Sequence, residues 1–142
     1  MKIAFGTDEH TALTETVRGE LESRGHTVVA VDDGQWVEVG RAVGEAVASA
    51  RAYTGVLFCW TGTGASIAAN KVGGVRAALC TDAATAAGAR RWNDANVLVM
   101  GLRLTSSEVA TEMLDAWFAT AVDPDEVDVI VGLECPRGSL SG

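Results

Sequence analysis

The sequence predicts an α/β protein: a single domain with a three-layer, doubly wound, five-stranded parallel sheet of the Rossmann-like kind. Five short apolar runs alternate along the chain with amphipathic helical patterns, an order typical of a parallel sheet with helices on both faces. The runs are continuously apolar, as expected for strands that are buried on both sides. The 142 residues suffice for one domain with a substantial core.

The apolar runs give the expected strands, which lie at residues 2–6, 27–31, 55–59, 75–80 and 96–100. Turn-forming residues bound them; the second run, for example, is closed by Asp32, Asp33 and Gly34. Because strand, helix and strand follow one another, the crossovers should be right-handed.

Helical patterns fill the intervals between the strands. Leu13, Val17 and Leu21 recur at a spacing of four residues, and Gly25 would end that helix. Similar patterns predict helices over 39–50, 66–71, 82–91 and 109–117.

The last of these helices is preceded by the sequence pattern of a capping box, in which Thr105 is the cap and Glu108 stands three residues later. Residues 123–142 are less regular and form a divergent C-terminal tail. Within it, the apolar run 127–131 is compatible with a short strand or a helical turn.

Charge and composition exclude several classes of protein. Nineteen acidic side chains against eleven basic ones give a net charge of −8, so we expect neither nucleic acid nor an anionic membrane as a partner. No apolar run reaches the roughly 18 residues of a membrane helix. Three cysteines without metal or disulfide spacing, and two isolated histidines, predict a soluble cytoplasmic protein without a metal site.

Ligands of an open parallel sheet bind beyond the carboxyl ends of its strands. The richest segment there is 59–66, Cys-Trp-Thr-Gly-Thr-Gly-Ala-Ser. Its glycines let the backbone approach a ligand, and successive N–H groups that lead into a helix form a nest for an anion. Thr61, Thr63 and Ser66 add hydroxyl groups. Residues 92–95 follow a helix and would need another reason to approach this site.

Cys59 ends the third strand and faces this turn, where positive dipoles favour its thiolate. A base beside an oxyanion hole suits proton abstraction next to a carbonyl. The alternative is an inert core thiol, which Cys80 and Cys135 fit better. The turn is not a P-loop, because no Gly-Lys-Ser/Thr follows, and Ile67 stands where a dinucleotide fingerprint requires a third glycine or alanine.

Several stretches carry a resemblance to a known family. They are Leu57-Phe-Cys-Trp-Thr-Gly-Thr-Gly-Ala-Ser-Ile-Ala-Ala-Asn-Lys71, Val75-Arg-Ala-Ala-Leu-Cys80, Asn93-Asp-Ala-Asn-Val97 and Gly6-Thr-Asp8. They resemble the type B ribose-5-phosphate isomerase and galactose-6-phosphate isomerase family, and the similarity runs from residue 1 to about residue 120.

The resemblance implies a homodimer with active sites at the subunit interface. It also implies cofactor-free aldose–ketose isomerisation of a sugar phosphate, such as ribose 5-phosphate, through an enediolate. Cys59 matches the cysteine that many members use as the base. Some members instead carry a glutamate where Ala65 stands, so Cys59 is the only matching candidate here. The other matching positions are Thr61 near the hydroxyl chemistry, the turn Gly62, Thr63, Gly64 and Ser66 for the enediolate, Asp8 and Asn93 for the sugar, and Arg103 for the phosphate.

Other positions depart from the family pattern. Glu9 follows Asp8 where a histidine is usual, Trp60 replaces a glycine, and Trp92 replaces the histidine that the resemblance implies for ring opening. We expect these three residues to face the substrate, and Trp36 to line the mouth of the site with Trp60 and Trp92. Ordinary packing at a dimer interface is the alternative for the tryptophans. The tail lacks the family's arginine pattern, and Arg137 is its only cation.

The departures leave two alternatives to a sugar-phosphate isomerase. One is an isomerase or epimerase of an unphosphorylated or modified sugar, because expected phosphate ligands are missing and Trp92 cannot transfer protons. The other is a non-catalytic ligand-binding homologue, or one subunit of a hetero-oligomer that supplies the missing cations.

Overall fold

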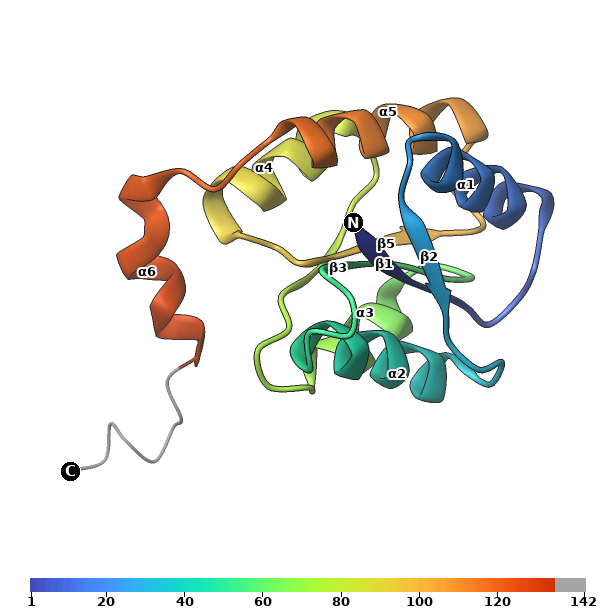
Figure 1. The fold of residues 1–142 in the computed structure, drawn as a ribbon, viewed down its shortest axis with the longest axis horizontal. Helices are drawn as coiled ribbons and strands as arrows, with labels where there is room; N and C mark the ends of the chain where they lie inside the picture. Colours follow the sequence, from blue (N-terminus) through green and yellow to red (C-terminus); the bar gives the residue numbers. More distant parts are fainter. Residues whose placement is uncertain (135–142) are drawn as a thin grey trace.

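The computed structural model describes residues 1–134, and it confirms the predicted doubly wound α/β architecture. Five parallel strands lie in the order β2-β1-β3-β5-β4. Figure 1 shows this sheet between its layers of helices. The strands are β1 (Lys2–Thr7), β2 (Thr27–Ala30), β3 (Thr54–Cys59), β4 (Ala77–Leu79) and β5 (Val97–Gly101). Cys135 and Arg137 lie outside the described residues.

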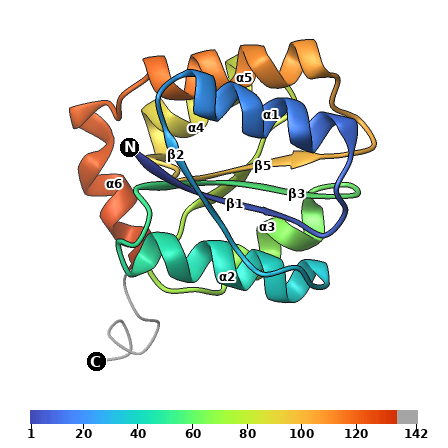
Figure 2. The same cartoon turned by 45° about the vertical axis from the view of Figure 1, so that its right-hand side comes forward.

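Two layers of helices enclose the sheet. Helices α1 (Ala12–Ser23), α4 (Ala83–Asn93) and α5 (Ser107–Ala119) cover one face, and α2 (Trp36–Ala48) and α3 (Thr63–Asn70) cover the other, as Figure 2 shows from a second direction. After α5 the chain continues through the 3-10 turn η1 (Pro124–Glu126), helix α6 (Val127–Val131) and the turn η2 (Gly132–Glu134). The run 127–131 is therefore a helical turn and not a strand. No helix of residues 1–134 combines the length and apolar character needed to cross a membrane.

The central strand β3 is buried along its whole length and supplies both cores. Val56 and Phe58 project into the layer of α1, α4 and α5, whereas Leu57 and Cys59 project into the layer of α2 and α3. This alternation follows from the two-residue period of a strand. It fixes the Cys59 side chain on the side of the sheet where α3 begins.

Helices α2, α3 and α5 begin earlier than predicted, and α2 starts at Trp36, three residues before the predicted start at 39. Helix α3 starts at Thr63, three residues earlier than the apolar pattern indicates, because Gly62 adopts a left-handed conformation that turns the chain at once. The predicted capping box of Thr105 and Glu108 is wrong: Ser106 caps α5 by accepting a hydrogen bond from the N–H of Val109 at 3.2 Å. Thr105 belongs to the preceding turn, where its N–H donates to the carbonyl of Gly101 at 3.1 Å.

The edge strand β4 is shorter than its apolar run because side-chain amides take over the pairing at its start. The N–H of Arg76 donates to Oδ1 of Asn96 at 2.7 Å. Asn70, the last residue of α3, binds the backbone of Ala77 from the open side, with its Nδ2 3.0 Å from the carbonyl oxygen and its Oδ1 2.8 Å from the N–H. The end of α3 is thereby fixed to the edge of the sheet.

Candidate active site

Strands β1, β3 and β5 end together, and their ends define what we term the carboxyl edge. The register pairs Thr7 with Phe58 and Cys59 with Gly101. Beyond the ladder, the N–H of Leu102 donates to the carbonyl of Cys59 and that of Arg103 to the carbonyl of Trp60, both at 2.9 Å. The loops after β3 and β5 are therefore held side by side.

The Cys59 thiol lies against the N-terminus of α3. The residue is only 5 % exposed, and its Sγ accepts a hydrogen bond from the N–H of Ala65 at 3.5 Å. This N–H belongs to the first turn of the helix, whose amide groups have no partner within the helix. The sulfur consequently lies at the positive end of the α3 dipole.

Gly62 makes the sharp turn that brings α3 to this position. Its φ is +82°, a conformation that other residues adopt only with strain. A Cβ at Gly62 would overlap Cδ1 of Leu79 and lie 3.2 Å from the backbone nitrogen of Gly101. Because Gly62 also has no side chain to cap α3, the first N–H groups of the helix are left for an anion at the carboxyl edge.

Hydroxyl groups line the same turn. The Oγ1 atoms of Thr61 and Thr63 are 2.9 Å apart and both residues are exposed. Ser66 is half-buried, and its N–H makes the first helical bond, to the carbonyl of Gly62 at 3.1 Å. The turn thus combines backbone donors with a hydrogen-bonded hydroxyl pair within four residues of the thiol.

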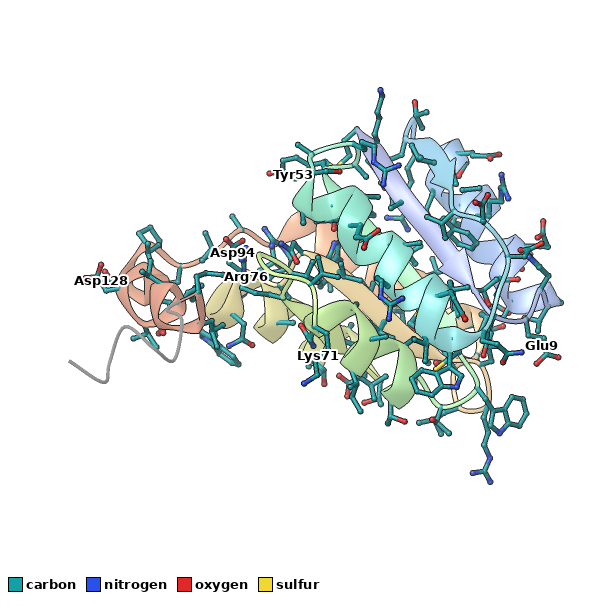
Figure 3. The ribbon with its side chains drawn as sticks, turned by 90° about the horizontal axis from the view of Figure 1, so that it is seen from below. Glu9, Tyr53, Lys71, Arg76, Asp94 and Asp128 are labelled. Atoms are coloured by element: carbon teal, nitrogen blue, oxygen red, sulfur yellow. The ribbon has the colours of Figure 1, made fainter. Side chains whose placement is uncertain are left out.

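Asp8 and Glu9 follow β1 directly, so they stand beside the end of β3 at the carboxyl edge; Figure 3 shows Glu9 there. Thr7 fixes this loop, because its Oγ1 donates to the carbonyl of Glu9 at 2.7 Å. Partial burial raises the pKa of Asp8, and the charge of Glu9 adds to the effect, while a backbone hydrogen bond opposes it. No group of three His, Cys, Asp or Glu side chains in residues 1–134 is placed to hold a metal ion.

Trp36, Trp60 and Arg103 also lie at this edge. Trp36 is the first residue of α2, and its indole covers Gly64, where a Cβ would come within 2.8 Å of Cε3. Trp60 is 58 % exposed. Arg103 is exposed and its backbone is bonded to that of Trp60.

Trp92 and Asn93 lie at the opposite edge of the sheet, which we term the amino edge. Helix α4 starts after the carboxyl end of β4 and runs back, so its last residues precede the start of β5. In Figure 3 the next residue, Asp94, lies beside Arg76 at the end opposite Glu9. The expectation that Trp92 lines the same mouth as Trp36 and Trp60 is therefore wrong for a single chain, because a parallel crossover helix returns to the edge where its strand begins.

The Trp92 ring instead packs along its own helix. A Cβ at Gly88, four residues earlier, would lie 2.8 Å from Cζ3 of the indole. Trp92 and Asn93 can approach a Cys59 turn only on a second chain. A cluster of charged side chains surrounds Asp94 at this edge and was not predicted; the isolated charge of Arg76 at the start of an apolar run is the one sign of it in the sequence.

An open parallel sheet that ends in a glycine turn, with a thiol on the helix N-terminus, belongs to the class of α/β proteins in which small ligands bind at the carboxyl edge. The chain belongs to the ribose/galactose isomerase family, whose model matches residues 3–130. It is 36 % identical over 149 residues to ribose-5-phosphate isomerase B of Escherichia coli, a match that covers 96 % of this chain and 98 % of the relative.

Two further comparisons agree with this membership. The chain is 34 % identical to D-erythrulose-4-phosphate isomerase of Pectobacterium atrosepticum, with 82 % of each protein covered. The structure of ribose-5-phosphate isomerase B of Clostridium thermocellum superposes with a TM-score of 0.89 at 33 % identity and covers 94 % of this chain and 95 % of that one. These relatives are named as isomerases of different sugar phosphates.

Proposed function

We propose that this protein is a cofactor-independent aldose–ketose isomerase of a sugar phosphate such as ribose 5-phosphate, with Cys59 as its base. The observation that carries the proposal is the contact of the Cys59 sulfur with the first turn of α3, at 3.5 Å from the N–H of Ala65. Base and anion-binding turn are then adjacent, as isomerisation through an enediolate requires.

The reaction begins with removal of the proton on C2 of the aldose. The Cys59 thiolate takes this proton, the electron pair of the C–H bond moves into the C1–C2 bond, and the carbonyl π electrons move to the oxygen. The N–H groups of Gly62, Thr63 and Gly64 stabilise that negative oxygen, since the next two N–H groups of the turn are bonded to the Cys59 sulfur and to the carbonyl of Gly62. The thiol then returns the proton to C1, and the adjacent hydroxyls of Thr61 and Thr63 pass the second proton between the two oxygens.

Substrate binding at the carboxyl edge involves the residues that surround the turn. Asp8 binds sugar hydroxyls, Arg103 reaches the phosphate, and Trp60 covers the sugar with its exposed indole. Glu9 lies at the same edge, and its carboxylate repels negatively charged groups of a ligand.

The complete site needs a second copy of the chain. Asn93 and Trp92 lie at the amino edge, so we propose a homodimer in which they complete the carboxyl edge of the partner. A two-fold axis gives two such sites for each dimer.

Hydrogen exchange tests the chemistry. We would incubate the protein with ribose 5-phosphate, erythrulose 4-phosphate and galactose 6-phosphate in deuterated water and follow C1 and C2 by NMR. We expect exchange with at least one sugar, its loss in Cys59→Ala, and its retention in Cys80→Ala, which alters a buried thiol in the other core. Exchange in Cys59→Ala at the wild-type rate would overturn the assignment of the base. Binding without exchange would favour a non-catalytic homologue.

Subunit mixing tests the shared site. We expect the Cys59→Ala chain to be inactive and the Asn93→Ala chain to be strongly impaired but still measurable. In a random mixture, half of the dimers contain one of each chain and hold one intact site, so about a quarter of wild-type activity should return. A mixture no more active than its components would argue against a site built from two chains.

An unphosphorylated sugar is the second candidate, favoured by the exposed carboxylate of Glu9 beside the turn. A dianionic phosphate would be repelled there, whereas a neutral sugar would not. Comparing each phosphate with its free sugar decides between the two, and Glu9→Gln should lower KM only for a phosphorylated substrate.

A further inference from the structure

Asp94 occupies a strained position that two arginines hold in place. It stands in the turn between α4 and β5 with a φ of +46°, in the left-handed region. Its Oδ1 accepts a hydrogen bond from Nη1 of Arg90 at 3.0 Å, and its Oδ2 accepts one from Nη2 of Arg76 at 3.3 Å. Arg76 also donates from Nε to the Asp94 carbonyl at 2.8 Å. The side chain and the backbone of one residue are therefore fixed together.

The two arginines are themselves anchored to separate parts of the fold. Arg90 donates to the carbonyl of Ala95 at 2.6 Å, and its guanidinium lies 5.5 Å from the ring centre of Trp117. Arg76 pairs with Glu134 of η2 at 2.9 Å. The arginine side chains are 20 % exposed or less, whereas the carboxylates of Asp94 and Glu134 are 37 % and 41 % exposed, so these ion pairs are partly shielded from solvent.

The choice of aspartate at this position needs an explanation beyond backbone shape. Glycine would adopt a φ of +46° without strain, and asparagine tolerates it as well as aspartate does, so the backbone alone does not require a charged residue here. The charge of the aspartate pairs with Arg90 of α4 and with Arg76 at the start of β4, and Arg76 in turn pairs with Glu134 of η2. Strain that is held by surrounding contacts is typical of a functional constraint on a neighbouring residue.

The neighbouring residue is Asn93, the last residue of α4. It is exposed, and within residues 1–134 its side chain forms no hydrogen bond that would orient it. Its direction is therefore set by the backbone on either side of it, and on one side that backbone is the turn at Asp94.

We infer that Asp94, through its ion pairs with Arg76 and Arg90, is a positioning residue that aims Asn93 at the substrate in the partner subunit. The inference rests on the proposed function, because it takes Asn93 as part of the shared site. Asp94 does not touch the substrate; it fixes the turn from which Asn93 projects.

Two variants separate positioning from folding. Asp94→Gly keeps the left-handed turn and removes both ion pairs, whereas Asp94→Asn keeps the turn and one acceptor. We expect kcat to fall about tenfold or more in Asp94→Gly, since a small displacement near the reacting atoms can cost up to ~100-fold, and we expect Asp94→Asn to recover part of the loss. Asp115→Asn, which removes the 2.6 Å ion pair with Arg24 elsewhere on the surface, should leave kcat unchanged.

A double-mutant cycle with Asn93→Ala distinguishes positioning of Asn93 from a general structural role of Asp94. If Asp94 acts through Asn93, adding Asp94→Gly to Asn93→Ala should change kcat by less than about twofold, because the two effects are not independent. Equal effects of Asp94→Gly in both backgrounds would overturn the inference.

The side-chain amide of Asn93 provides a test without turnover. In the wild-type chain we expect one sharp pair of amide proton signals, identified by its loss in Asn93→Ala, and in Asp94→Gly we expect broadening or a second pair. An unchanged signal in Asp94→Gly would overturn the inference even if the enzyme is active. Absence of hydrogen exchange in the wild type would overturn the proposed function instead, and the amide signals would still decide whether Asp94 positions Asn93.

Discussion

The indole of Trp36 lies directly on the backbone of Gly64, so closely that a Cβ there would be 2.8 Å from Cε3 and 3.0 Å from Cδ2 of the ring. One residue opens α2 and the other lies in the first turn of α3. The contact locks the entrance of one helix onto the anion-binding end of the other. A change in either residue should therefore affect both packing and the turn.

Gly64→Ala is the first test of this contact. Because the added methyl must displace the indole, we expect the free energy of unfolding to fall by about 1–3 kcal/mol. We also expect kcat/KM to fall about tenfold or more, since the displaced turn carries the proposed anion donors. Chemical denaturation and steady-state kinetics measure the two effects.

Two controls accompany that variant. Gly73→Ala adds the same methyl where no atom lies within 4 Å and φ is not positive, so it should be neutral or slightly stabilising. Adding Trp36→Ala to Gly64→Ala should reduce the destabilising effect of the methyl. A full loss of stability in the double variant would show that the indole is not the obstacle.

Gly62→Ala tests the turn itself, and Gly25→Ala is its matched control. Both glycines have a φ above +80°, so both substitutions should cost about 1–2 kcal/mol for the left-handed backbone. Only Gly62 has crowded surroundings, with Leu79 and Gly101 in the path of a Cβ. We expect Gly62→Ala to cost about 1–3 kcal/mol more than Gly25→Ala in urea unfolding. Equal losses would place the whole effect in the backbone.

Asp8 should make stability depend on pH in a specific direction. Burial and Glu9 raise its pKa in the folded protein, so the folded state holds the proton more tightly than the unfolded state does. Its ionisation therefore opposes folding once the pH rises above the ordinary value of 3.8.

Asp8→Asn should accordingly be more stable relative to wild type at pH 7 than at pH 3, while its KM for the sugar rises. Urea unfolding at the two pH values measures the first effect. NMR titration of Asp8 in Glu9→Gln should give a lower pKa than in the wild type, because one negative neighbour is gone. A relative stability of Asp8→Asn that does not change with pH would contradict the prediction.

Cys80 gives a second dependence on pH, at alkaline values. Burial, together with the charge of Asp82, raises the pKa of its thiol from 9.0 to about 12. Between these values the unfolded chain ionises and the folded chain does not, so stability falls as the pH rises.

We expect the Cys80 thiol to cost the wild type about 1 kcal/mol of stability at pH 10 relative to pH 8, and Cys80→Ala to lack this loss. Cys59 and Cys135 are present in both the wild type and the variant, so their contributions to the pH dependence cancel in the comparison. Parallel pH profiles for the two chains would show that the Cys80 thiol titrates normally.

Most of the fold could be predicted because it depends on local pattern. The continuous apolar runs and the helical spacing gave five strands, their helices and the parallel class. What could not be predicted depends on contacts distant in sequence. Side-chain amides of Asn70 and Asn96 shorten β4, and the bond from Thr105 to Gly101 moves the cap of α5 to Ser106.

The candidate site divides in the same way. Ligands of an open parallel sheet bind beyond the carboxyl ends of its strands. This rule pointed to the turn around Cys59 and the loop at Asp8, because both follow predicted strands directly. Trp92 was expected at the same mouth, but α4 carries it to the amino edge. The cluster of Arg76, Arg90 and Asp94 was not predicted, because it joins the start of one strand to the end of a helix that comes later in the chain.

The pairing of Asn70 with Ala77 has a consequence for behaviour in concentrated solution. An open sheet presents unpaired backbone groups on its outermost strand, and these can recruit a strand from another molecule. The Asn70 amide occupies both hydrogen-bonding groups of Ala77 on the open side of β4, and that strand is only three residues long. This end of the sheet offers no continuous ladder to an incoming strand, and the protein is protected there against edge-to-edge aggregation.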